Sequence, residues 1–293
     1  MKRAKWICAF VLLLPALLQA QAAPSGDEER GWSFAQRFQG STNSAGVILK
    51  TNSTLFYQLN QHVEMYGGVP VYFARESSAN STTGGPKFMN GVGNVFTGLV
   101  FSTSSPMVNF SSDLVATAPT GDKDRGFSTG HVTVDWTNTL SRSFESITPF
   151  ASIGLANTVS DTAFFVRPFS SNGAVAHFEG GALIGVMPRT EIGGSAYAVR
   201  ASGDQHVISK VRRQQSTSTT AGRPTTTVGR QNKGVFETQT DVTGSAAIAN
   251  DHGFSTWFTL RPSATSDIQV GYSRSVSYQL DSLFFGIGFR VGR

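Results

Sequence analysis

The segment from Leu283 to Gly292 alternates between large apolar residues and small or polar ones, and this alternation limits the fold more than any other feature of the sequence. One face would carry Leu283, Phe285, Ile287, Phe289 and Val291, and the opposite face Gly286, Gly288, Arg290 and Gly292. Side chains alternate in this way along a β-strand. We therefore expect a strand with one face suited to lipid and the other to a water-filled interior.

The same period of two recurs along the chain and predicts about twelve strands. A hairpin of long strands stands out at 45–59 and 62–74, joined by only a few residues around Gln61. The expected strands cover 32–40, 45–59, 62–74, 92–102, 107–118, 129–138, 143–156, 176–187, 190–201, 252–261, 266–277 and 281–291.

The connections between these strands alternate between short and long. The short ones lie near Asn60, Ser104, 139–142, Pro188 and Pro262, and the long ones over 75–91, 119–128, 157–175 and 202–251. Outer-membrane barrels join their strands by short periplasmic turns and longer outer loops. This ordering predicts an all-β fold, a transmembrane antiparallel up-and-down β-barrel of about twelve strands, closed because unpaired backbone amides are costly in lipid.

Aromatic residues fall near many expected strand ends, as in the interfacial girdles of membrane barrels. They include Trp32, Tyr57, Phe73, Phe101, Trp136, Phe258, Tyr272 and Phe289. In the alternative fold, a soluble β-sandwich, the same side chains would form the core. A sandwich gives no reason to sort loops by length onto one end, so the barrel is the preferred interpretation.

The start of the chain has the features of an export signal. Three basic residues within the first five precede an apolar stretch from Trp6 to Leu18, and Ala20-Gln21-Ala22 is typical of a cleavage site. We expect a signal peptide over 1–23, an N-terminal tail over 24–30 and one barrel domain over 31–293. The barrel is expected in the cell outer membrane, in contact with lipid and lipopolysaccharide.

Charge and cysteine content argue against two further kinds of protein, one that binds nucleic acid and one stabilised by disulfides. The formal net charge of +5 includes Lys2, Arg3 and Lys5 of the signal, and about +2 remains without them, which gives no basis for a nucleic-acid partner. Cys8, the only cysteine, lies within the signal, so no disulfide is expected in the mature chain.

Two glycine-rich patterns carry a family resemblance. One is Gly91-Val92-Gly93-Asn94-Val95, like a Gly-x-Gly-Asp strand start with Asn94 where Asp is usual, and the other is Ala118-Pro119-Thr120-Gly121-Asp122 followed by Ser128-Thr129-Gly130. Together with Phe285-Gly286-Ile287-Gly288-Phe289, they resemble the outer-membrane family named after the meta-pathway of phenol degradation. The resemblance implies a β-barrel that transports small hydrophobic or aromatic compounds and is inserted by the barrel assembly machinery. The chain ends on Arg290-Val291-Gly292-Arg293, where such barrels usually present an aromatic residue.

For a passive channel with a small-molecule solute, the side chains that matter are those expected to face the lumen. They are Lys50, Gln58, Glu64, Tyr66, His131, Asp135, Glu179, Trp257, Gln269 and Arg290. A lumen with both signs of charge favours water and small polar solutes. In the alternative, opposite charges pair and fill the narrow interior of a twelve-stranded barrel.

Two other functions stay open on the sequence. A non-transporting barrel would serve structure or surface adhesion through its loops. A membrane lipid hydrolase would need a serine beside a base, and the available pairs are Ser128 with His131 and Ser170 with His177. Neither spacing predicts a catalytic dyad, so the chain is not expected to be an enzyme.

No cofactor or metal site is expected. His177 and Glu179 share one face of a strand, but two ligands without partners do not make a metal site.

The segment over 202–251 is expected to be a long extracellular loop. Between Gln205 and Lys233 it contains Lys210, Arg212, Arg213, Arg223, Arg230 and Lys233 and no acidic residue. Its Ser/Thr-rich centre favours disorder. The alternatives are that the loop binds anionic polysaccharide or lipid phosphates, or that it folds inward as a plug.

Overall fold

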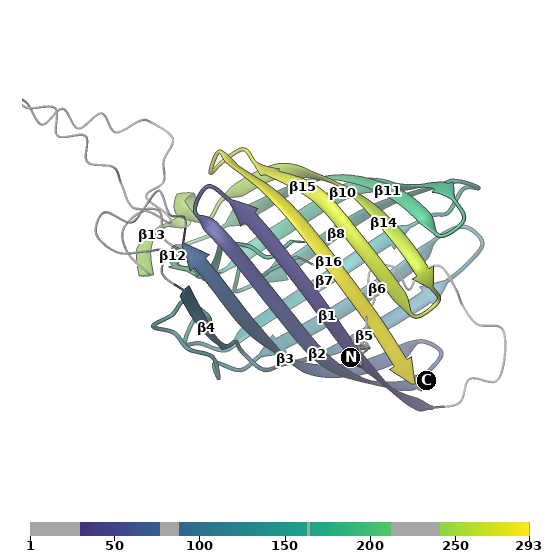
Figure 1. Cartoon of the computed structure of the whole chain (residues 1–293), viewed down its shortest axis with the longest axis horizontal. Coiled ribbons are helices and arrows are strands. Elements are labelled where there is room, and N and C mark those ends of the chain that lie inside the picture. Colours follow the sequence, from purple (N-terminus) through teal and green to yellow (C-terminus); the bar gives the residue numbers. More distant parts are fainter. Residues whose placement is uncertain (1–29, 77–87, 163–164, 212–240, 293) are drawn as a thin grey trace, which may run out of the picture.

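The chain forms a closed antiparallel β-barrel of twelve strands, as the sequence predicted (Figure 1). It was analysed as a computed structural model that describes residues 30–76, 88–162, 165–211 and 241–292. The hydrogen-bonded order is β2-β1-β16-β15-β14-β11-β10-β8-β7-β6-β5-β3, and pairing of β2 with β3 closes the cylinder. Closure leaves no unpaired barrel edge in lipid. The expected signal peptide over 1–23 lies outside the described residues, as does the tail over 24–30 except for Arg30.

The barrel strands agree with the expected ranges to within a few residues. They are β1 (Gly31–Asn43), β2 (Gly46–Asn60), β3 (Val63–Glu76), β5 (Phe96–Ser104), β6 (Asn109–Thr117), β7 (Thr133–Ser141), β8 (Ile147–Ala156), β10 (Val175–Met187), β11 (Thr190–Ala201), β14 (Asp251–Ser263), β15 (Ser266–Ser275) and β16 (Leu280–Gly292). The segment expected over 92–102 is interrupted instead. Only Val92 of it belongs to the short strand β4 (Phe88–Val92), which pairs with the outer half of β3, and β5 begins at Phe96 after three residues outside any strand.

The interruption between β4 and β5 lies opposite Pro70. Strand β3 pairs with β5 as far as Gly68 and with β4 from Val71 onward. Proline has no amide hydrogen to donate to a neighbouring strand. Across the break, the Gly93 N–H donates a hydrogen bond to the Pro70 carbonyl at 2.8 Å.

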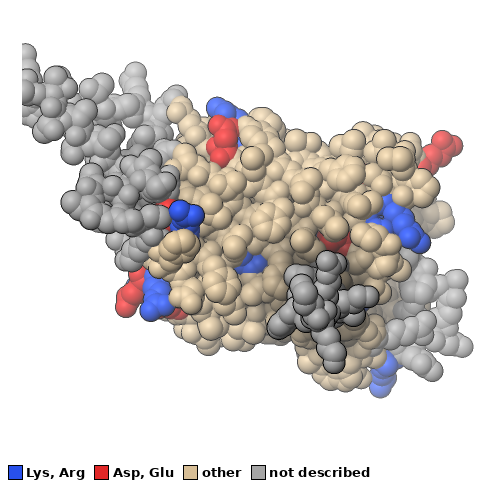
Figure 2. Space-filling view, in the orientation of Figure 1, with Lys and Arg blue, Asp and Glu red and all other residues tan. Residues whose placement is uncertain are grey.

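Apolar side chains cover the outside of the barrel. In β16 the outward residues are Leu283, Phe285, Ile287, Phe289 and Val291, as the alternation predicted, and the inward ones include Ser282 and Phe284. Figure 2 shows mostly uncharged residues on this face, with Lys, Arg, Asp and Glu few and mainly toward the two ends. This distribution is what a lipid-facing surface requires. No helix in the described part of the chain is long and apolar enough to cross a membrane.

Both described ends of the chain, at β1 and β16, lie at the same end of the barrel as the short turns. These turns are at 61–62, 105–108, 142–146, 188–189 and 264–265. The described parts of the long connections, over 118–132, 157–162, 165–174, 202–211 and 241–250, lie at the other end, which is the outer end in a barrel of this type. The outer connections at 44–45 and 276–279 are as short as the periplasmic turns.

Part of the outer loops forms a second, smaller sheet. It contains β9 (Phe169–Asn172), β12 (Asp204–Ser209) and β13 (Asp241–Ser245), and a 3₁₀ turn follows at Ala246–Ile248. The segment expected as one open loop over 202–251 therefore includes two strands, and its residues 212–240 lie outside the described part. Phe169 and Val207 of this sheet are buried against Val175 and Leu280 at the outer ends of β10 and β16.

Candidate functional site

A cavity of about 480 Å³ lies inside the barrel. Its outer end is lined by loop residues Ser128 and Thr158, and it extends along the wall to Ser111 and Thr139. These last two residues lie two positions from the periplasmic ends of β6 and β7. The cavity thus spans most of the height of the barrel along this wall.

The opposite wall of the lumen is filled by side chains. Arg37 in β1 contacts Asp267 at 3.2 Å and Gln269 at 2.6 Å, both in β15. Next to them, Trp257 and Phe284 pack against Phe165 from the loop between β8 and β9. Among the strands, β6, β7 and β10 contribute the most residues to the cavity lining, although the cavity also reaches Arg37, Lys50 and Tyr72 on β1, β2 and β3. We call the side of β6, β7 and β10 the open wall.

An ionic cluster pins the inner loop between β8 and β9 to the wall. Asp161 accepts bonds from Lys50 in β2 at 2.9 Å, from Lys210 after β12 at 2.7 Å and from the Tyr72 hydroxyl in β3 at 2.9 Å. Burial would raise the pKa of the Asp161 carboxyl, but Lys210 and Lys50 outweigh it and hold that pKa well below its usual range. Asp161 is therefore ionised at neutral pH and joins two loops to the barrel.

Arg167 secures the same loop on its other side. Its guanidinium lies 3.4 Å from the Asp251 carboxylate in β14 and 5.2 Å from the centre of the Tyr197 ring. The Ser41 hydroxyl in β1 donates to the Val166 carbonyl at 2.7 Å. These contacts hold the loop inside the outer half of the lumen.

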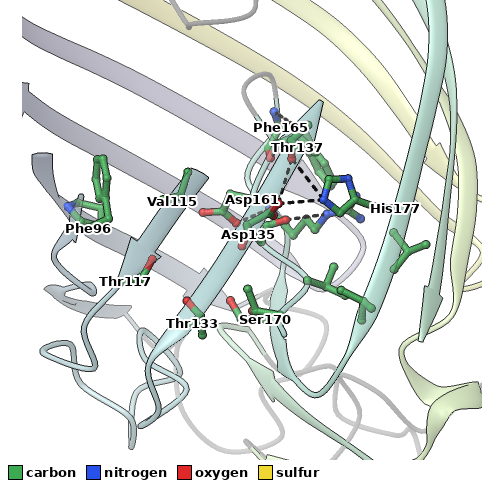
Figure 3. A pocket seen from close by; sticks show the side chains of 18 of the residues that line it. Phe96, Val115, Thr117, Thr133, Asp135, Thr137, Asp161, Phe165, Ser170 and His177 are labelled. Carbon is green, nitrogen blue, oxygen red and sulfur yellow. Dashed lines mark hydrogen bonds and ion pairs between the residues drawn. The ribbon is translucent and has the colours of Figure 1, made fainter. Parts of the chain in front are cut away.

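The open wall carries a second polar cluster, shown in Figure 3. His177 Nε2 in β10 lies 3.0 Å from Asp135 Oδ1 in β7, and the Thr137 hydroxyl donates to the same carboxylate at 2.9 Å. On the neighbouring strand, Asp113 accepts a bond from the Tyr66 hydroxyl at 2.9 Å. All of these side chains line the cavity.

The residues that the sequence placed in the lumen are divided among four environments. Lys50, Tyr66, Asp135 and Glu179 line the cavity.

Glu64, Trp257, Gln269 and Arg290 also point inward, but they belong to packed parts of the lumen. Arg290 bonds to Glu64 near the periplasmic end and covers the Phe56 ring. Gln58 lies at the periplasmic turn, where its amide donates to the Asn60 carbonyl.

His131 has a different position from the one expected. It is exposed in the loop before β7 and is not part of the cavity lining, because β7 begins at Thr133 rather than at 129. Conversely, no pattern in the sequence assigned Asp161 or Arg167 to the lumen, since loop residues have no periodicity that assigns them to a face. Lys210 was expected only as one basic residue of a loop for which an inward fold was one alternative.

The two glycine-rich patterns meet at the outer rim of the barrel. Asn94 Oδ1 accepts the Gly121 N–H at 3.0 Å, and the Thr120 hydroxyl accepts the Val95 N–H at 2.8 Å. A Cβ atom on Gly121 would lie 2.9 Å from the Gly93 Cα, so only glycine fits at this approach. The patterns therefore build the junction between the loop over 118–132 and the break after β4.

Neither serine–histidine pair has the geometry of a dyad. The Ser128 hydroxyl accepts the Gly130 N–H, and His177 Nε2 contacts both Asp135 and Thr137. A catalytic histidine uses one ring nitrogen for the nucleophile and the other for the orienting carboxylate, whereas here both partners lie at Nε2. Among the described residues no group of three or more His, Cys, Asp or Glu could hold a metal ion.

Comparison with known proteins gives structural similarity alone. No family model and no curated protein sequence matches the chain. The fold is similar to the COG4313 outer membrane channel from Pseudomonas putida F1, with a TM-score of 0.54 and 13% identity over 96% of this chain and 99% of that one. The KdgM porin in complex with disordered oligogalacturonate has a TM-score of 0.46 and 6% identity, over 87% and 98%. The TodX deltaS2S3 mutant monoaromatic hydrocarbon channel has 0.43 and 9%, over 92% and 91%.

At 13% identity, the similarity to the COG4313 channel shows a shared fold. The similarity to the other two structures, with TM-scores below 0.5, supports no conclusion about this chain. The shared fold is that of an outer-membrane barrel, and the apolar outer surface is what this location requires. The chain is an outer-membrane β-barrel.

Proposed function

We propose that the protein is a passive outer-membrane channel for small solutes, and that these include small aromatic compounds with polar groups. The observation that carries the proposal is the cavity along β6 and β7, which extends from the outer loops to within two residues of the periplasmic ends of these strands. A barrel that served only structure or adhesion would have no need for such a space. Polar side chains along the cavity supply the hydrogen bonds that a permeating solute loses when it leaves water.

The aromatic part of the proposal rests on the cavity lining and on the motifs. Tyr66, Phe96 and Tyr72 line the cavity beside Ser, Thr and Asp residues, so a ring with polar substituents would find both kinds of contact. The two glycine-rich patterns resemble those of a family that transports hydrocarbon or aromatic compounds. They support this solute class only indirectly, because their residues form the outer junction.

Liposome swelling tests the proposal. Purified barrel in liposomes should admit small solutes to which a bilayer is poorly permeable, including small sugars and the aromatic zwitterion phenylalanine, faster than protein-free liposomes do. Swelling should decline as the solute becomes larger, because the loop over 157–168 narrows the outer half of the lumen. Equal swelling with and without folded protein would refute the channel, and flux of small sugars without flux of aromatic solutes would refute the solute class.

A further inference from the structure

The cavity has charged groups on two sides, and they differ in how they are compensated. The basic side chains that line it are Arg37, Lys50, Arg167 and Lys210. Each has a carboxylate partner within 4 Å, supplied by Asp267, Asp161 or Asp251. Because Lys50 and Lys210 share Asp161, these three carboxylates compensate three of the four positive charges.

Within the described ranges, the carboxylates of the open wall have no such Lys or Arg partner. Asp113, Asp135 and Glu179 line the cavity on β6, β7 and β10, and no Lys or Arg of the described residues lies within ion-pair distance of them. Asp113 is held by the neutral Tyr66 hydroxyl. Asp135 is held by Thr137 and by His177, which is charged only when protonated.

The carboxylates of Asp113 and Asp135 also lie close to one another. The register pairs Asp113 with Thr137 and Val115 with Asp135, which places the two acids on diagonal positions of neighbouring strands. A permeating solute that follows the open wall passes both of them. A charge in a narrow, partly dehydrated passage acts over several ångströms because the surrounding protein screens it poorly.

Aromatic rings lie next to these carboxylates. The Tyr66 ring, whose hydroxyl bonds to Asp113, lies 6.1 Å from the Phe96 ring in an edge-to-face arrangement, and both residues line the cavity. A cation is attracted both by a carboxylate and by the face of an aromatic ring. An organic amine with a ring of its own can use both contacts at once.

We propose that Asp113, Asp135 and Glu179 make the channel select small cations, including aromatic amines, over anions of the same size. This inference rests on the proposed channel function. Carboxylates that line a pore give preference to cations. The mostly compensated basic side provides no equal attraction for anions.

The first test is the reversal potential of the reconstituted protein in a KCl gradient at neutral pH. The wild type should have a K⁺ to Cl⁻ permeability ratio clearly above unity, and the double variant Asp113→Asn, Asp135→Asn should have a ratio closer to unity. Asp281→Asn is the matched control, because Asp281 is exposed on the outside of β16 and bonds to Arg274. A wild-type ratio at or below unity would overturn the inference even if the double variant does not fold.

A second test separates this inference from the channel itself. Benzyltrimethylammonium, phenylalanine and benzenesulfonate share a ring, cross a bare bilayer slowly and differ in net charge, and their flux into liposomes that contain the barrel should fall in that order. Equal flux of all three through a conducting barrel would overturn the selectivity and leave the channel intact. No flux and no current would reject both.

Discussion

Lys210 Nζ lies 2.7 Å from Asp161 Oδ1, which joins the beginning of the longest outer connection to the inner loop between β8 and β9. The other oxygen of the same carboxylate lies 2.9 Å from Lys50 Nζ in the barrel wall. One acidic side chain thus fixes two loops to one strand at the outer end of the lumen. Its removal should affect both the stability of the barrel and its permeability.

We expect Asp161→Asn to destabilise the folded barrel and to raise its conductance. The variant leaves two buried amines without a carboxylate, and breaking a buried pair by removing one partner costs about 3–5 kcal/mol. The temperature at which the folded band is lost on a heat-modifiability gel should fall, and single-channel conductance should rise as the inner loop loosens. Asp281→Asn should change neither, and an unchanged Asp161→Asn variant would show that the loops are held by other contacts.

The same cluster predicts how the barrel responds to acid. The folded-state pKa of Asp161 lies below its unfolded value of about 3.9, so its contribution to stability is complete above that pH. The contribution is lost as the pH falls from there toward the folded pKa. Asp161 should therefore keep the inner loop in place from neutral pH to about pH 4, and loosening of this loop should raise conductance only at lower pH. A rise already near pH 6, in the wild type but not in Asp161→Asn, would contradict this assignment.

The junction of the two glycine-rich patterns depends on an acceptor oxygen at position 94 rather than on a negative charge. Asn94 accepts the Gly121 N–H through its side-chain oxygen, and an aspartate would offer the same acceptor. Asn94→Asp should leave the folded band and the conductance unchanged. Asn94→Leu should lower the free energy of unfolding by about 1–2 kcal/mol, because it leaves the Gly121 N–H without its acceptor. Equal stability of Asn94→Leu would show that the bond is dispensable.

The substitution of Gly121 by valine tests the same junction through its backbone. The new Cβ atom would meet the Gly93 backbone at 2.9 Å, so the loop must move away from the break after β4. We expect lower thermal stability and faster proteolysis of the loop over 118–132 in intact cells. Gly203→Val is the control. Gly203 has a positive φ of 69°, and a Cβ atom there would meet nothing within 4 Å, so this variant introduces backbone strain without a steric clash.

Two neighbouring residues in β7, one facing the lumen and one facing lipid, provide a test substitution and its matched control. Thr139 lines the cavity, whereas Leu140 points to lipid and is 50% exposed. Thr139→Trp should lower single-channel conductance by roughly half or more, because a bulky ring would occupy the narrow passage. Leu140→Trp should leave conductance unchanged, since tryptophan is well accommodated at the membrane interface. If both variants conduct like the wild type, solutes do not pass along this wall.

Period-two alternation was sufficient to predict the barrel strands and the direction of their side chains. Lys50, Asp135 and Glu179 lie in regular strands, so counting along each strand assigns them to the inner face. The alternation gave no information about what fills the lumen. Trp257 was expected to face an open space and instead packs against Phe165, which belongs to an inward-folded loop.

The positions of the loops, unlike those of the strands, could not be predicted from the sequence, because they depend on contacts between residues far apart in the chain. Lys210 looked like one of several solvated basic residues, but it is buried against Asp161, which lies on a different connection. No local pattern marks such a pair. The inward fold of a plug was one of the alternatives for this loop, and residues 204–211 adopt it in part.

The conductance of single wild-type barrels in a planar bilayer tests the central claim most directly. Folded protein, verified by heat modifiability, should produce discrete current steps at neutral pH, and the steps should grow in Asp161→Asn. Folded protein that inserts and yet gives no steps, in the wild type and in Asp161→Asn alike, would contradict a channel along β6 and β7.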